Sequence, residues 1–167
     1  MVSDTGLIRS ISNRISATRL SELLKEQLWV VPTSQSIHII AVSIVFVCAL
    51  LISFRLLGIG RSERPVSGMI KKQSRMINAG LFTLLFTGTI QTIAEPDRQF
   101  GSPAFWLKML LIVFALLLTY WLARNTQRDP QRWDLAASRP AWSRIHAVIY
   151  VAAWAAIIFC GRFIGYT

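Results

Sequence analysis

The apolar segments of this sequence lack the residues from which most catalytic sites are built. None of the four long apolar segments contains Asp or Glu, which excludes a carboxylate proton relay running through them. Gly58 and Gly60 follow a predicted membrane helix and not a strand, so they do not form a dinucleotide-binding loop. The whole chain has only two Cys and two His. These absences argue against a self-contained enzyme, and we expect no catalysis from this chain on its own.

What the sequence has in quantity is apolar residues in long blocks, and 53% of its 167 residues are hydrophobic. A helix needs roughly 20 such residues to cross a hydrocarbon core of about 30 Å. Segments at about 36–58, 74–94, 104–123 and 142–165 meet or approach this length. We therefore predict an all-α integral membrane protein, a four-helix bundle over residues 34–167.

Residues 1–33 are different, because they hold leucines and isoleucines among charges without a continuous apolar core. They are therefore no cleaved signal peptide. Two apolar stripes, Ile8–Ile15 and Leu20–Leu28, are rotated relative to each other, which predicts two short amphipathic helices with a break near 16–18. We expect them to lie on the outer membrane surface, with Pro32 ending the second helix and Thr33 or Ser34 capping the first span.

The net charge of +10 comes from 18 Lys and Arg against 8 Asp and Glu, and its distribution predicts the topology. Eleven basic residues flank or lie in the connections between spans one and two and between spans three and four: Arg55, Arg61, Arg64, Lys71, Lys72, Arg75, Arg124, Arg128, Arg132, Arg139 and Arg144. Basic residues near span ends stay on the cytoplasmic side. Both termini should therefore face the periplasm from a bacterial inner membrane. No basic stretch carries the features of a nucleic-acid site.

The connections also carry signals. The turn-rich segment 95–103 predicts a tight outer loop that makes spans two and three a hairpin. The segment 124–144 predicts a loop with one helical turn at 133–137, after which Pro140 opens the fourth helix. Residues recur every four positions at Gly80, Leu84 and Gly88 and at Ala152, Ala156 and Cys160, and we expect these two faces to form the tightest helix contact. The alternative is that they only reflect the high background of Gly and Ala in membrane helices.

The two histidines fall at opposite ends of the predicted bundle. His38 is near the outer end of span one, whereas His146 is near the inner end of span four, so their depths differ by roughly 20 Å. They cannot both bind one haem or one metal ion. His146, next to Trp142 and Arg144, is interpreted as an interfacial residue.

His38 shares its expected depth with Met109 in span three and Cys160 in span four. Imidazole, thioether and thiolate are ligands suited to copper, and His with Met suits a haem iron. The alternative is that the three are unconnected core residues. Cys48 and Cys160 lie at different depths, so we expect no disulfide between them.

Several stretches together resemble an uncharacterised family of small four-span bacterial inner-membrane proteins, a domain of unknown function. They are Trp29-Val-Val-Pro32 followed by His38, RLLG at 55–58, SPAFWLKMLL at 102–111 and GRFIGY at 161–166. That family is distantly similar to copper-resistance protein D and to HemJ-type haem-binding membrane proteins. The resemblance implies a metal or haem role for His38 at the outer face.

Two functions from different classes follow. The first is a non-catalytic membrane subunit or accessory protein that supports redox or copper chemistry at the periplasmic face, with copper or haem b as cofactor and His38, Met109 and Cys160 as ligands. The second is a haem-binding oxidoreductase subunit that uses His38 and Met109. A purely structural or assembly role is a third. The expected partners are the lipid bilayer and a periplasmic or membrane redox protein, and an oligomer is compatible with each.

Overall fold

Helices make up almost all of the chain that the computed structural model describes, which is residues 3–59, 65–134 and 142–164, and no strand occurs there. The helices are α1 (Ser3–Ser16), α2 (Arg19–Glu26), α3 (Val30–Leu57), α4 (Val66–Ala94), α5 (Pro96–Gly101), α6 (Pro103–Arg128), α7 (Pro130–Asp134) and α8 (Trp142–Phe163). Four of them, α3, α4, α6 and α8, are long and apolar enough to cross a membrane. The predicted all-α, four-span architecture is confirmed, and the chain is a multi-pass membrane protein.

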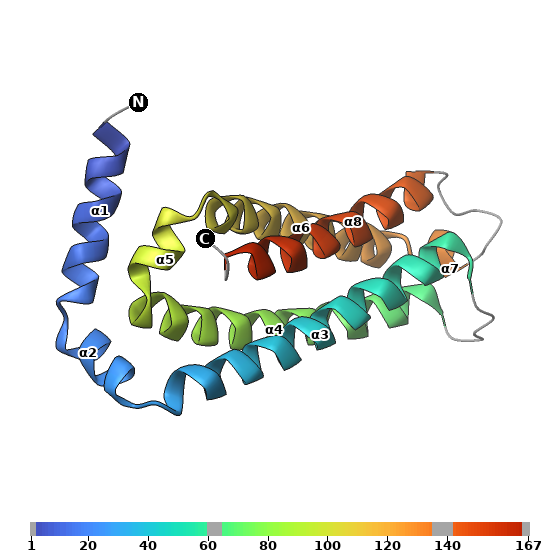
Figure 1. The fold of residues 1–167 in the computed structure, drawn as a ribbon. Helices are drawn as coiled ribbons and strands as arrows, with labels where there is room; N and C mark the ends of the chain where they lie inside the picture. Colours follow the sequence, from blue (N-terminus) through green and yellow to red (C-terminus); the bar gives the residue numbers. More distant parts are fainter. Residues whose placement is uncertain (1–2, 60–64, 135–141, 165–167) are drawn as a thin grey trace.

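The four long helices form two layers, α3 with α4 and α6 with α8 (Figure 1). α3 packs closely on both α4 and α8, and α6 packs on α8, whereas α4 meets α6 less extensively. Within the described residues α4 makes no contact with α8. The expected contact between their small-residue faces is therefore wrong. Gly80 instead lies against Val45 of α3, because the missing side chain lets consecutive antiparallel helices approach closely.

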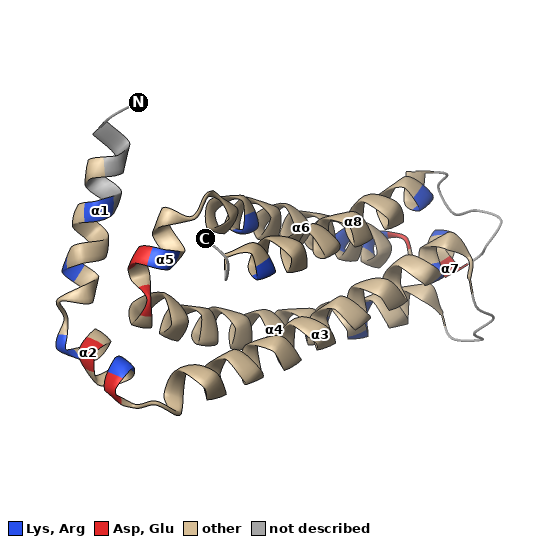
Figure 2. Ribbon diagram, viewed as in Figure 1, with Lys and Arg blue, Asp and Glu red and all other residues tan. Residues whose placement is uncertain are grey.

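The bundle has two distinct ends. The terminal end holds α1, α2, α5 and both chain termini, and the distal end holds α7 and the starts of α4 and α8 (Figure 1). An even number of long helices places both termini at one end. Acidic residues gather around α2 and α5 at the terminal end (Figure 2).

The apolar core lies mainly in the middle and the distal half of the bundle. Its members on α3 run from Val45 to Leu56, those on α4 from Val66 to Ile77 and those on α6 from Ala115 to Leu122, with Trp133, Ala147, Tyr150, Ala153, Trp154 and Ile157 completing it. Buried residues of α3 and α4 toward the terminal end include the polar Ser34 and Thr87. Within the α3/α4 layer, the packing is therefore apolar toward the distal end and includes polar contacts toward the terminal end.

The N-terminal segment forms the two short helices that the sequence predicts, with the break at residues 17 and 18. Thr18 caps α2 by accepting a hydrogen bond from the Ser21 backbone N–H at 3.3 Å. Ser12 is hydrogen-bonded to Asp97 of α5, and the Ser21 hydroxyl donates to the Ile93 carbonyl at 2.9 Å. These bonds attach α1 and α2 to the terminal end of the bundle. Their placement on a membrane surface stays a prediction.

Several predicted boundaries differ from the structure. Pro32 does not end α2 and neither Thr33 nor Ser34 caps the first span, because α3 begins at Val30 and takes Pro32 into its first turn, where no backbone donor is lost. The 95–103 connection contains the helix α5 and is no simple loop. The helical turn expected at 133–137 begins earlier, since α7 covers Pro130–Asp134, and residues 135–137 and Pro140 lie outside the described residues.

Candidate functional site

His38 of α3 is held by a hydrogen bond to α4. Its Nδ1 lies 2.7 Å from the Thr87 hydroxyl oxygen, and that hydroxyl donates its single proton to the Thr83 carbonyl at 2.8 Å. When the Thr87 hydroxyl donates to Thr83, it accepts from His38, and the neutral ring then carries its proton on Nδ1. The other nitrogen, Nε2, keeps its lone pair and is bonded to no described residue. This is the arrangement of a metal-binding histidine, whose second ring nitrogen is oriented by a hydrogen-bond acceptor.

Two glycines give the site its room. A methyl group added at Gly88 would lie 3.6 Å from His38 Cε1, and one added at Gly161 would lie 3.7 Å from the Lys108 Nζ. His38 therefore lies against the backbone of α4, and Lys108 lies against the backbone of α8. Larger side chains at these two positions would occupy the space beside the imidazole and the ammonium group.

Lys108 of α6 is half-buried, close enough to both His38 and Cys160 for electrostatic interaction. None of the described residues hydrogen-bonds to its ammonium or forms an ion pair with it. An ammonium group within a membrane bundle is costly unless it meets an oxygen ligand or an anion. The sequence indicated only a side chain reaching outward to water, and the structure places it against α8.

None of the described contacts joins His38 directly to Cys160 or Met109, although His38 and Cys160 each interact electrostatically with Lys108. His38, Lys108 and Cys160 form what we call the His38 cluster, together with Thr87 and Gly88, the neighbours of His38 on α4. Met109 is 43% exposed on α6, and none of the described contacts joins it to His38. Its role as a ligand stays a prediction.

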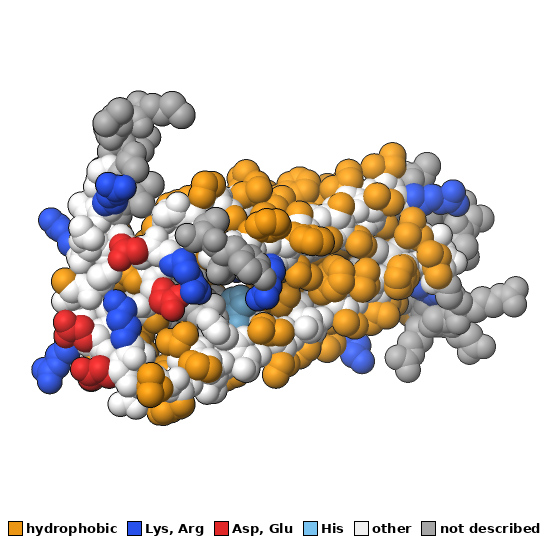
Figure 3. All heavy atoms as spheres, in the orientation of Figure 1, with side chains coloured by type: hydrophobic (Ala, Val, Ile, Leu, Met, Phe, Trp, Pro, Cys, Tyr) orange, Lys and Arg blue, Asp and Glu red, His pale blue; other side chains and the backbone are white. Residues whose placement is uncertain are grey.

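The His38 cluster is accessible from one face of the molecule. Figure 3 shows a histidine side chain in a hollow between Lys and Arg side chains. His38 is the half-buried histidine of the chain, whereas His146 is only 6% exposed. Around the cluster, the Ser34 hydroxyl donates to the Thr87 carbonyl at 3.2 Å, and the buried Gln91 amide nitrogen has no hydrogen-bond partner. The surroundings of His38 are therefore polar, although the helices are apolar.

His146 has a different environment at the distal end. Its ring is stacked between Trp121 and Tyr150, with centroid distances of 5.5 and 5.9 Å, and Trp142 lies edge-on to it. These aromatic rings cover His146, which is only 6% exposed, and its position at the membrane interface stays a prediction. The ring contacts make His146 part of an aromatic cluster, and its Nε2 has no hydrogen-bond partner among the described residues.

The separation of the two histidines can be followed along α6. Lys108 is near His38 and Trp121 is stacked on His146, and 13 residues of helix span roughly 20 Å. One haem or metal ion therefore cannot bind both. No three His, Cys, Asp or Glu side chains within the described part of the chain are grouped so that they could hold a metal ion.

The His38 cluster thus offers one nitrogen lone pair, one thiol and one unpaired ammonium group. A bare metal cation fits this set poorly, since Lys108 repels it and only two soft ligands are near. A cofactor that needs one imidazole ligand and carries carboxylates fits better, since the ammonium can pair with a carboxylate. The residues around His38 are therefore compatible with a haem-type group.

Thr87 and Lys108 are the site residues that sequence reasoning missed. Thr87 is one of four threonines between 83 and 92 on α4, and nothing in the sequence distinguishes it from the others. Lys108 gave a signal, because a lone cation six residues into α6 is unusual in an apolar segment. The sequence could therefore have pointed to Lys108, whereas the helix packing had to reveal Thr87.

Comparison with known proteins gives one match. The model of a family of unknown function (DUF6644) matches residues 28–167, which include the four long helices and the His38 cluster. No curated protein and no solved structure matches the sequence.

Proposed function

Because the chain belongs to this family of unknown function, we propose a role from the site itself: a non-catalytic membrane subunit that holds a redox cofactor at the terminal end. Haem b is the cofactor that the donor set favours, with His38 Nε2 as the axial ligand. The observation that carries this proposal is the hydrogen bond between His38 Nδ1 and Thr87 at 2.7 Å, because it leaves Nε2 available and fixes the ring.

Lys108 supports a cofactor with carboxylates. Its ammonium group would pair with a propionate, and Arg162, next to Gly161 on α8, adds positive charge at the same end. Bound haem would supply one-electron redox chemistry. The protein would hold the cofactor, orient its ligand and limit the access of water. A membrane or periplasmic partner would exchange the electron.

Copper is the second candidate, and a specific observation favours it. Lys108 interacts electrostatically with His38 and with Cys160, which agrees with the common depth that the sequence predicts for the imidazole and the thiol. These ligands suit reduced copper. Met109 would have to turn inward to complete the set, and the Lys108 charge opposes the metal. We rank this reading second for these two reasons.

The proposed location is the bacterial inner membrane with both termini in the periplasm. Figure 2 shows acidic residues concentrated at the terminal end, whereas the eleven basic residues named above flank the distal connections. Basic residues near spans favour the cytoplasmic side. The His38 cluster would then face the periplasm. Reporter fusions at either terminus test this topology.

The experiment is a visible spectrum and elemental analysis of detergent-purified protein. We expect a Soret band in protein made with sufficient haem, lost in His38→Ala and weakened in Thr87→Val. His146→Ala is the matched control, since it removes the other histidine and should keep the band. Copper retained by the wild type and lost in both His38→Ala and Cys160→Ser would favour the second candidate. Colourless, metal-free protein after haem and copper supplementation would leave a structural role.

A further inference from the structure

The loosely closed side of the bundle, between α4 and α6, contains a groove of ≈ 450 Å³. In the apolar 18-residue stretch of each long helix, only 11% is buried in α4 and 17% in α6, whereas 33% is buried in both α3 and α8. The short helix α5 connects α4 to α6 and separates their ends (Figure 1). The two helices therefore leave a groove between them.

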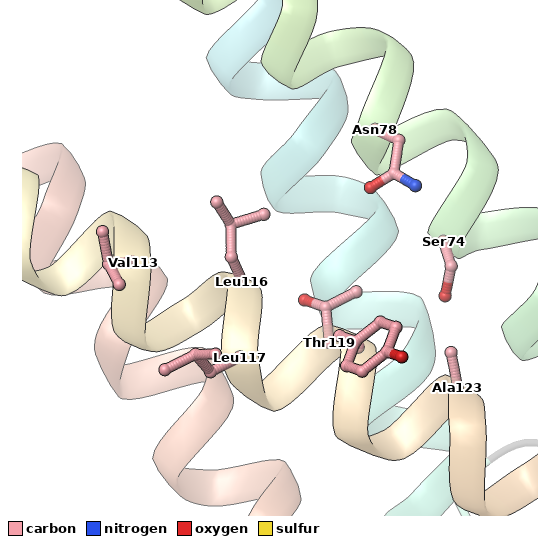
Figure 4. A pocket seen from close by; sticks show the side chains of 8 residues that line it. Ser74, Asn78, Val113, Leu116, Leu117, Thr119 and Ala123 are labelled. Carbon is pink, nitrogen blue, oxygen red and sulfur yellow. The ribbon is translucent and has the colours of Figure 1, made fainter.

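The groove changes from apolar to polar along its length. Figure 4 shows Val113, Leu116 and Leu117 on α6 along one part of it, and Ser74, Asn78 and Thr119 along the other. Seven residues of helix, about 10 Å, separate Val113 from Tyr120. The apolar part therefore lies toward the middle of the bundle and the polar part toward the distal end.

Two polar groups on the α4 side have no partner. The Ser74 hydroxyl is buried without a hydrogen bond, and Asn78 lies in the groove without one among the described residues. Polar groups at membrane depth are costly unless an occupant satisfies them. Both can donate a hydrogen bond, so they favour an occupant with oxygen acceptors, such as ester carbonyls.

Basic side chains border the polar part. Lys71, Ser74, Arg75 and Asn78 share one face of α4 by helical spacing, and Arg124 of α6 donates to the Tyr120 hydroxyl at 2.9 Å. The described carboxylates at this end are engaged elsewhere: Asp134 accepts from Ser67 and Asp129 accepts from the Arg132 backbone N–H. This border thus presents positive charge to an anionic head group.

We propose that the α4/α6 groove binds an anionic phospholipid of the leaflet at the distal end. An acyl chain lies along Val113 and Leu117, a glycerol ester oxygen accepts from Asn78, and the phosphate lies near Arg75 and Arg124. Along the groove, an apolar wall is followed by hydrogen-bond donors and then by basic side chains. A phospholipid has its acyl chain, ester oxygens and phosphate in the same order. The site is independent of the cofactor proposed for His38.

The test is lipid binding to delipidated full-length protein, by native mass spectrometry with added phosphatidylglycerol. We expect one tightly held lipid, with phosphatidylethanolamine held far more weakly. Each basic residue near an anionic head group raises the binding affinity about fivefold. Replacing both Arg75 and Arg124 by Gln should therefore weaken binding roughly thirtyfold. Arg144→Gln, a basic residue of α8 at the same end, is the control and should change nothing.

Leu117→Trp keeps the charges and fills the apolar part, so it should also displace the lipid. Leu117 is 62% exposed, and the folded state of each variant is checked by its helix content and its single elution peak. Equal retention of both lipids would overturn the proposal. So would binding unchanged by Leu117→Trp, or a dimer of this chain in which the groove excludes lipid.

Discussion

The contact between Gly80 of α4 and Val45 of α3 sets how closely the two helices approach, and Gly80→Ala tests it. The added methyl group would overlap the Val45 Cγ2 and lie 3.8 Å from its Cβ. Val45 is fully buried, at 0% exposure, and its branched side chain has one strongly preferred rotamer in a helix. Val45 therefore cannot turn aside, and the helices must separate.

The expected cost follows from two opposing effects. Overpacking a buried contact costs about 1–3 kcal/mol, and replacing Gly in a helix returns about 1 kcal/mol. We predict a net loss of up to about 2 kcal/mol in the free energy of unfolding, measured by titrating detergent-solubilised protein with a denaturing detergent. Gly88→Ala is the matched control, because its methyl group would meet His38 Cε1 at an ordinary 3.6 Å.

A double-mutant cycle makes the test sharper. Val45→Ala alone removes two buried methyl groups and should cost about 2 kcal/mol. Combined with Gly80→Ala, the new methyl group enters the space that Val45 leaves, so the two effects should fall short of their sum by about 1 kcal/mol or more. Additive losses, or equal losses for Gly80→Ala and Gly88→Ala, would refute the packing argument.

Three further outcomes are expected. Asp134 accepts hydrogen bonds from the Ser67 backbone N–H at 2.9 Å and from the Ser67 hydroxyl at 3.0 Å. Asp134→Ala should therefore destabilise the start of α4 by about 1 kcal/mol and speed hydrogen exchange there. Unchanged exchange would show that Asp134 does not cap α4. Tyr150→Phe removes the 2.6 Å bond to Thr119 and should cost about 1 kcal/mol in the same unfolding assay, while a neutral effect would show that the bond contributes nothing net. His146→Phe keeps the ring stack and removes an unpaired nitrogen, so its free energy of unfolding should equal or exceed that of the wild type. His146→Ala should lose about 2–4 kcal/mol. A loss of that size in His146→Phe would indicate that a polar contact of His146 contributes to stability.

The four long helices could be predicted because a membrane span leaves a strong and simple signal, a run of about 20 apolar residues. The break between α1 and α2 was also visible, since the apolar stripe changes its face there. The prediction that Pro32 ends a helix was wrong. Proline breaks a helix in its interior but is tolerated in its first turn, and Pro32 lies in the first turn of α3.

The pairing of the helices could not be read from the sequence. Gly80 and Gly88 correctly indicated a close approach, but their partner proved to be α3 and not α8. Small residues indicate that another helix packs closely there, but they do not indicate which helix it is. The position of Thr87 opposite His38 depends on this pairing, so the hydrogen bond that orients the imidazole was hidden as well.

The most direct test of the His38 site is chemical rescue of a cavity variant. In His38→Gly, the proposed haem should be lost or weakly held, and imidazole added to the haem-supplemented protein should restore the Soret band of the wild type. The same addition should leave the wild-type spectrum unchanged. A wild-type spectrum in His38→Gly without imidazole, or no haem bound by the wild type under any supplementation, would contradict the account.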